Sequence, residues 1–321
     1  MVHGGRRRSS SRIRKHLRRQ PGLDLSRDRV FVATLLLLGA SQGASYLFIR
    51  VGVRELSPPA LMEIRLLFAT PLLVAYCVAR GRGAELRAAW REGLVLGLLG
   101  AAIPWTLVGW GAQHVDAGVT AIANAAVPIF VAVIAAKALP GERVTGMRLA
   151  GVLLGLAGVA LLTGAYPQGG WWGVAGTLSV VAAAPAYALG TLYAQRQRVG
   201  SLVIATSGLV WATVLLLPFA VATHPGHLPS PKAFTAAVVL GVLCTAPAHA
   251  LFYWMVSAHG ASRSALVTYV TPVFALALGA LFLGEQATPP KLGGLVLIVT
   301  GVALGSGVGR FRRSVPLAQS A

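Results

Sequence analysis

Long apolar runs separated by short polar connectors dominate the pattern of this 321-residue chain. A helix that crosses a bilayer needs about 20 mostly apolar residues, and runs of that length recur along the whole sequence. Internal prolines such as Pro71, Pro128 and Pro272 fit spans in which neighbouring helices satisfy the freed backbone groups. The pattern predicts an all-α polytopic membrane protein with ten transmembrane helices, at residues 30–49, 59–79, 93–111, 117–137, 147–165, 171–194, 201–222, 235–257, 263–283 and 291–309.

The composition excludes an ordinary soluble domain. Hydrophobic residues make up 55% of the chain and charged residues only 12%, whereas a soluble protein is about a quarter charged. The two cysteines, Cys77 and Cys244, lie far apart inside predicted spans, so the sequence offers neither a disulfide framework nor metal-ligand spacing. We therefore expect no metal site and no cofactor.

Positive charge is concentrated on one side of the predicted topology. Ten of the 28 Lys and Arg residues lie in residues 1–29, and the net charge is +19. With a cytoplasmic N-terminus, the cytoplasmic segments hold 23 of them and the outer connectors hold 4, namely Arg50, Arg54, Lys232 and Lys291. This distribution follows the positive-inside rule and predicts that both termini are cytoplasmic. No nucleic-acid-binding fold follows the basic tail, so we expect no nucleic-acid partner.

An internal repeat divides the chain into two halves. A shift of 144 residues aligns the halves, with a one-residue slip near the end of the fourth predicted helix. The matched positions are Trp110 with Trp254, Ala121 with Ala265, Pro128 with Pro272, and Gly141-Glu142 with Gly284-Glu285. Each half holds five predicted helices, and because five is odd the second half enters the membrane in the opposite orientation. Inverted repeats of this kind are typical of alternating-access transporters.

These residues also carry a resemblance to a known family. Residues 262–304 resemble the terminal part of the EamA-type repeat of the drug/metabolite transporter superfamily, through Pro272, the Gly284-Glu285 pair and a glycine-rich last helix. Residues 118–162 repeat the pattern, residues 43–50 resemble the opening helix of that family, and Arg65 occupies the place of a typical second-helix arginine. The resemblance implies ten helices, an EamA-like fold and transport of small metabolites. The opening helix departs from the family pattern, because Gln42 stands where a Trp is usual.

Polar and aromatic residues deep in the predicted spans are the candidates for a substrate cavity, because a polar group is costly in hydrocarbon unless it faces a partner or water. His249 lies near the middle of the eighth span with Tyr253 one turn further on, although a lone His can also be structural. Gln42 and Tyr46 are spaced in the same way on the first span. The complete set of cavity candidates is Gln42, Tyr46, Arg65, Trp105, Asn124, His249, Tyr253 and Tyr269.

Two charged residues lie within the second predicted span. Glu63 is the only carboxylate this deep in a span, which makes it the candidate for proton coupling. Arg65 follows two residues later, about 200° around the helix axis, so the two side chains cannot share one face. Arg65 is close enough to the outer end for its long side chain to reach the interface, so a substrate or gating role and simple snorkelling both stay open.

Several enzyme-like patterns fail on their context. Residues 39–43 match the G-x-S-x-G nucleophile pattern, but that motif needs a strand-to-helix turn, whereas small residues on an apolar helix usually pack against another helix. His224 and His227 lie in a connector without a third metal ligand, and no H-E-x-x-H sequence occurs. Glu142 and Glu285, at the ends of predicted helices, are expected to cap or pair locally. We therefore predict no catalytic residues and no enzyme activity.

The sequence thus predicts a secondary transporter in the cytoplasmic membrane. Its expected substrate is a small metabolite, such as an amino acid or a related compound, or a drug, and the expected direction is export. A polytopic membrane enzyme and a non-transporting receptor or scaffold are the alternatives. The expected organisation is a basic tail at 1–29, repeats at 30–165 and 171–309, and a C-terminal tail at 310–321. The expected partners are a small-molecule substrate and the lipid bilayer, with a homodimer left open.

Overall fold

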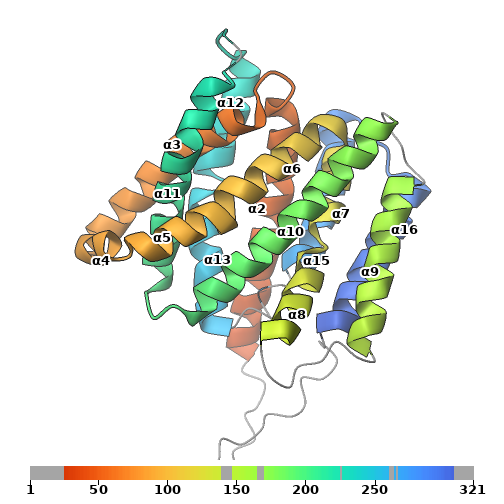
Figure 1. Cartoon of the computed structure of the whole chain (residues 1–321), viewed down its shortest axis with the longest axis horizontal. Helices are drawn as coiled ribbons and strands as arrows, with labels where there is room; N and C mark the ends of the chain where they lie inside the picture. Colours follow the sequence, from red (N-terminus) through yellow and green to blue (C-terminus); the bar gives the residue numbers. More distant parts are fainter. Residues whose placement is uncertain are drawn as a thin grey trace, which may run out of the picture.

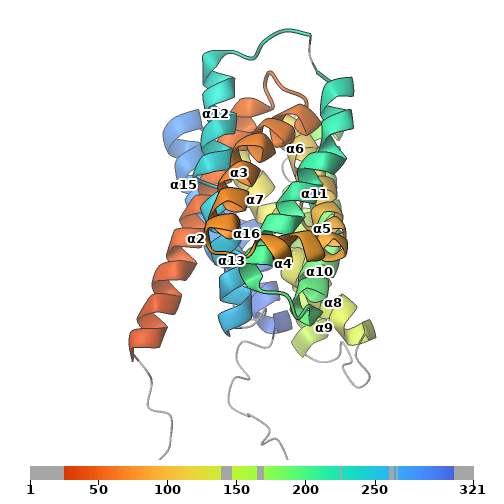
Figure 2. The same ribbon diagram turned by 90° about the vertical axis from the view of Figure 1, so that its left-hand side faces the viewer.

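Helices are the only regular elements in the described part of the chain. The computed structural model describes residues 25–138, 147–164, 170–224, 226–259, 264 and 267–306 (Figures 1 and 2). Its helices are α2 (Leu25–Gly52), α3 (Pro58–Ala79), α4 (Gly83–Ala88), α5 (Trp90–Gly97), the π-helix η1 (Leu98–Ala102), α6 (Ile103–His114), α7 (Ala117–Asn124), α8 (Val127–Ala138), α9 (Met147–Gly164), α10 (Trp171–Arg196), α11 (Ser201–Ala222), α12 (Pro231–Val242), α13 (Ala246–His259), α15 (Val267–Leu283) and α16 (Pro289–Ser306). The predicted all-helical class is confirmed.

Six helical segments of the described residues are long and apolar enough to cross a membrane. They are Val30–Gly52, Pro58–Ala79, Trp90–His114, Trp171–Arg196, Ser201–Ala222 and Pro231–His259. Two shorter apolar helices, Ala117–Val131 and Val270–Leu283, lie within the predicted fourth and ninth spans. Large apolar side chains such as Leu37, Phe219 and Leu281 are exposed on the outside of the bundle, as expected where lipid is the solvent.

Three of the predicted spans are interrupted rather than continuous. The third changes to a π-helix over Leu98–Ala102, the fourth breaks between α7 and α8, and the eighth breaks between α12 and α13. A proline follows closely in each, and because proline has no N–H it leaves the carbonyl four residues earlier without its helical donor. Pro71 and Pro272, by contrast, lie inside continuous helices, so a proline alone does not decide the break.

Glycines permit the closest helix contacts. Gly39 and Gly43 of α2 lie directly against Val270 and Phe274 of α15, so the G-x-S-x-G segment is a packing surface. The pair α9 and α16 packs in the same way, with Gly301 against the backbone of Gly155, and stands side by side at the right of Figure 1. Small residues at such contacts let two backbones approach, as is usual between helices in lipid.

The two described ends of the chain lie at the same end of the bundle, where α2 begins and α16 ends (bottom of Figure 1). At the opposite end, polar contacts join the two halves. The Glu285 carboxylate accepts hydrogen bonds from the backbone N–H groups of Ala117 and Gly118 at 2.8 and 3.2 Å. Glu285 therefore caps α7, a helix far away in sequence, while Glu142 lies outside the described residues.

Candidate functional site

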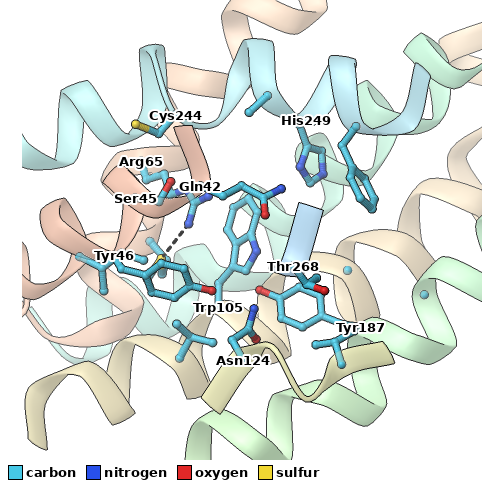
Figure 3. Close-up of a pocket in the computed structure, with 18 of the residues that line it drawn as sticks. Gln42, Ser45, Tyr46, Arg65, Trp105, Asn124, Tyr187, Cys244, His249 and Thr268 are labelled. Carbon is cyan, nitrogen blue, oxygen red and sulfur yellow. Dashed lines mark hydrogen bonds between the residues drawn. The ribbon is translucent and has the colours of Figure 1, made fainter. Parts of the chain in front are cut away.

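A cavity of about 170 Å³ lies inside the bundle and is lined by residues of both halves (Figure 3). The first half contributes from α2, α3, η1, α6 and the α7–α8 break. The second half contributes from α10, the α12–α13 break, α13 and α15. The polar and aromatic residues of its wall are Gln42, Ser45, Tyr46, Arg65, Trp105, Asn124, Tyr187, Thr191, Cys244, His249, Phe252, Tyr253 and Thr268. The wall thus combines one cation, several hydroxyl and amide groups, and a large aromatic surface.

Arg65 supplies the charge in this wall, and its side chain does not extend to the interface. It is only 7% exposed, and its backbone is backed by Gly241 of α12, where a side chain would collide with the Arg65 carbonyl. Its Nε donates a hydrogen bond to the Thr245 hydroxyl at 2.6 Å, and its Cζ lies 3.7 Å from the centre of the Trp105 ring. The snorkelling alternative is therefore wrong, because stacking and hydrogen bonding hold the guanidinium inside.

An aromatic chain crosses the cavity from one half to the other. The Trp105 ring meets His249 edge to face at a centroid distance of 5.7 Å, and His249 meets Tyr253 in the same way at 5.2 Å. Trp105 and His249 are separated by the repeat shift of 144 residues, so they occupy equivalent positions in the two halves. The π-helix before Trp105 and the α12–α13 break before His249 are also at matching places, and they give the two side chains room to meet.

Asn124 lies where the fourth predicted span is broken. It ends α7, and Pro128, four residues later, has no N–H with which to bond the Asn124 carbonyl. The side-chain oxygen Oδ1 of Asn124 is buried and has no hydrogen-bond partner within the described structure. The Tyr46 hydroxyl points toward Asn124 in Figure 3 and is within hydrogen-bonding reach of its amide. The side chain at position 124 therefore offers an acceptor oxygen at the cavity wall.

The structure gathers seven of the eight predicted cavity residues around this single cavity: Gln42, Tyr46, Arg65, Trp105, Asn124, His249 and Tyr253. The Tyr269 side chain lies outside the described part of the structure. Glu63 is 3% exposed but does not line the cavity. It lies two helical turns before Thr70 on the face of α3 that meets α11, where the Thr70 hydroxyl is 3.0 Å from that of Thr213. The expected separation of Glu63 from Arg65 is thus present.

Several wall residues were not predicted as cavity residues from the sequence, namely Ser45, Tyr187, Thr191, Cys244 and Thr268. The repeat contained the signal for two of them. Thr268 is the equivalent of Asn124 and Cys244 is the equivalent of Gly100, and all four of these residues line the cavity. No comparable signal exists for Tyr187, which looks like an ordinary aromatic residue within a long apolar helix.

The described residues contain no group of three His, Cys, Asp or Glu side chains that could hold a metal ion. His224 and His227 are exposed in the connector between α11 and α12. The Nδ1 of His224 accepts a hydrogen bond from the Gly226 N–H at 3.1 Å, so this histidine shapes its own turn.

Known proteins resemble this chain over most of its length. One is an uncharacterized transporter of Bacillus subtilis (strain 168), 30% identical over 77% of this chain and 82% of its own length. Another is a protein of Streptantibioticus cattleyicolor named as a probable terminal-alkyne amino-acid exporter, 30% identical over 85% of this chain and 92% of its own. A third is an uncharacterized inner membrane transporter of Escherichia coli (strain K12), 27% identical over 82% of this chain and 87% of its own.

A solved crystal structure shares the fold. It superposes with a TM-score of 0.64 at 23% sequence identity, covering 88% of this chain and 98% of its own. The family model of the EamA-like transporter family matches twice, at residues 30–164 and 174–306, which together make up most of the chain. The relatives carry the names of transporters, in agreement with that match. The chain belongs to the EamA-like transporter family.

Proposed function

We propose that this protein is a secondary transporter that exports a small metabolite, of the amino-acid or drug class, by alternating access. The observation that carries the proposal is the buried cavity at which polar and aromatic side chains of both halves meet. Alternating-access transporters built from repeats bind substrate at such an interface between the halves. The relative named as a probable terminal-alkyne amino-acid exporter supports the export direction and the amino-acid class.

The proposal includes ten crossings arranged as two inverted five-helix halves. Contacts between equivalent elements support it. The second predicted span, α3, packs on the seventh, α11, and the fifth, α9, packs on the tenth, α16. The contact of Trp105 with His249, two residues at equivalent positions, supports a two-fold axis close to the cavity. Rocking of one half against the other about this axis would expose the cavity to each side of the membrane in turn.

We also propose that both termini are cytoplasmic. The positive-inside distribution supports this orientation, and so does the common end of the bundle at which Leu25 and Ser306 lie. A reporter enzyme that is active only outside the membrane, fused after residue 321, should give no signal. The same reporter inserted at Gly226, in the connector between α11 and α12, should be active. The reverse pattern would overturn the orientation.

Glu63 is the residue to which we assign proton coupling. Both of its carboxylate oxygens are buried and have no hydrogen-bond partner within the described structure. A carboxylate is costly in that setting and is stabilised by taking up a proton, so the charge of this residue can follow the proton concentration. The helix that carries Glu63, α3, packs against α11 of the other half, so protonation of Glu63 would be linked to the packing of the halves.

Replacement of Glu63 separates coupling from binding. In proteoliposomes, Glu63→Gln should keep the exchange of substrate across the membrane at equilibrium but lose accumulation driven by a pH gradient. The partly exposed Glu92 in α5 supplies the control, and Glu92→Gln should retain both activities. Gradient-driven accumulation that is unchanged in Glu63→Gln would remove Glu63 from the mechanism.

The transport function itself is tested at His249 and Tyr253. Cells that overproduce the protein should show faster efflux of at least one compound from a panel of amino acids, nucleosides, sugars and drugs. His249→Ala should lose most of this efflux, since it removes the ring that joins Trp105 to Tyr253, and Tyr253→Phe should lower it. Rates are normalised to the amount of folded protein in the membrane.

A matched control removes a histidine that does not face the cavity. His224→Ala, in the exposed connector, should leave efflux at the wild-type rate. If His249→Ala lowers only the amount of folded protein, while each molecule transports normally, the residue is structural and the cavity is not the transport site. Efflux of no compound in the panel would count against the transporter itself.

A further inference from the structure

Arg65 is a buried cation whose charge is not balanced by the cavity wall. None of the described residues lining the cavity is Asp or Glu, and Arg65 forms no salt bridge with a described carboxylate. A buried charge without a partner is unfavourable, and the contacts with Thr245 and Trp105 compensate only in part. The wall therefore favours an occupant that brings a negative charge to Arg65.

The guanidinium of Arg65 lies at the cavity wall and keeps donors that no described residue engages. A guanidinium has five N–H donors, and two are engaged, by the Thr245 hydroxyl through Nε and by the Met62 sulfur through Nη1 at 3.7 Å. Trp105 covers one face of the group. Because the N–H bonds lie in the plane of the guanidinium, stacking does not block them, and the remaining donors match the two oxygens of a carboxylate.

At Asn124 the cavity wall offers a hydrogen-bond acceptor, whereas Arg65 offers donors. The buried Oδ1 of Asn124 lacks a partner in the described structure, and Asn124 is one of the residues that line the cavity. A carboxamide oxygen accepts hydrogen bonds, so this end of the cavity suits a donor such as an ammonium group. Figure 3 shows the Tyr46 hydroxyl between Arg65 and Asn124, so the two sites belong to one polar strip.

We propose that the cavity binds a small amino acid as a zwitterion, with its carboxylate on Arg65 and its ammonium group at Asn124. This assignment rests on the proposed transport function and adds the atoms that recognise the substrate. The volume of about 170 Å³ is close to that of an engineered cavity of about 150 Å³ that accepts benzene, so the cavity suits a small molecule, and leucine serves as the probe. The apolar surfaces of Trp105 and Phe252 would cover the leucine side chain.

Three probes separate the two subsites. L-Leucine carries both charged groups, 4-methylpentanoate lacks the ammonium group and isopentylamine lacks the carboxylate. With purified protein and isothermal titration calorimetry, leucine should bind most tightly, 4-methylpentanoate more weakly, and isopentylamine weakest of the three. The amine is the poorest ligand because it places a second cation in the same cavity as Arg65 and leaves the remaining donors of Arg65 unused.

Two substitutions should affect different subsets of the same probes. Arg65→Gln should weaken both carboxylate probes about thirtyfold, equivalent to about 2 kcal/mol, because it removes one partner of a buried charged pair. Asn124→Leu should weaken leucine by a smaller factor of about ten and leave 4-methylpentanoate unchanged. Lys232→Gln removes a positive charge from the exposed start of α12 and should leave all three affinities unchanged.

The subsites are overturned if isopentylamine binds as tightly as leucine, if neither carboxylate probe binds wild-type protein, or if Arg65→Gln leaves leucine affinity intact. The comparison of the three probes on wild-type protein decides the question even if Arg65→Gln does not fold. The transporter proposal is judged separately. Efflux of another compound that depends on His249 would keep the transporter while removing the amino-acid subsites, whereas efflux of no compound would remove the transporter.

Discussion

The ion pair between Lys291 and Asp116 offers a direct test of how the two halves are held together. Lys291 lies at the start of α16, and Asp116 immediately precedes α7. Their side-chain atoms Nζ and Oδ2 are 2.6 Å apart, and Nζ also donates to the Gln286 carbonyl at 2.8 Å. The lysine side chain is 0% exposed and the aspartate side chain 16%, so water provides little alternative solvation. Lys291→Met removes the cation and keeps most of the volume.

The expected cost follows from the burial of the pair. Removal of one partner of a buried ion pair costs about 3–5 kcal/mol, because the other charge is left uncompensated. Asp116 keeps some contact with water and interacts with the charge of Arg50, which places the expected loss near the lower limit, at about 3 kcal/mol. At about 2 °C of unfolding temperature per kcal/mol, the midpoint should fall by about 6 °C.

Thermal unfolding of the purified protein in detergent measures this shift. Lys232→Met is the matched control, since Lys232 is exposed at the start of α12, and it should move the midpoint by less than about 1 °C. The double variant Asp116→Asn with Lys291→Met should lose less stability than the sum of the single variants, because neither charge is then left alone. Equal shifts for Lys291→Met and Lys232→Met would refute the reasoning.

Two further predictions concern the cavity wall and the end of the bundle. Cys244 lines the cavity and Cys77 is buried outside it, so a small thiol reagent should modify Cys244 faster, and a bound substrate should slow that reaction. Hydrogen bonds from the Ser230 hydroxyl and N–H, at 2.7 and 2.8 Å, hold the pKa of Glu55 below its usual value. The stability that these hydrogen bonds contribute is present above the unfolded pKa of about 4.3, and it is lost as the pH falls through the lower folded pKa. Acid should therefore lower the unfolding midpoint of wild-type protein more than that of Glu55→Gln.

Much of the fold could be predicted because the bilayer imposes a simple length rule. Each of the ten predicted spans begins within five residues of the start of a described helix, and the short α4 (Gly83–Ala88) is a helix that the apolar pattern could not reveal. Hydropathy does not distinguish a bent span from a straight one. Pro104 follows a π-helix, whereas Pro71 lies in an unbroken helix, and the difference depends on the neighbouring helices that satisfy the freed carbonyls.

The residues around the cavity could be predicted to the extent that polarity is rare at membrane depth. Arg65, Asn124 and His249 each stand out for that reason, and the spacing of two residues is enough to place Glu63 and Arg65 on different faces of their helix. Their partners could not be predicted. The contact of Trp105 with Arg65 depends on how α3 and α6 are rotated, and rotation is set by packing rather than by the composition of either helix.

The two halves repeat in sequence but differ in the chemistry that they bring to the cavity wall, and this difference suits the proposed transport function. The equivalent of Arg65 in the second half is Leu209, which is fully buried and does not line the cavity, so the charge of the wall comes from one half alone. Two similar halves give two similar ways of opening, one toward each side of the membrane. In the proposed mechanism, a single charge on one half would hold the substrate in the same orientation in both states. Trp105 stacks on Arg65, whereas His249, at the equivalent position, meets Trp105 edge to face, so the two equivalent rings have different surroundings. Under the proposed function, symmetry would account for the movement and its local loss for the recognition.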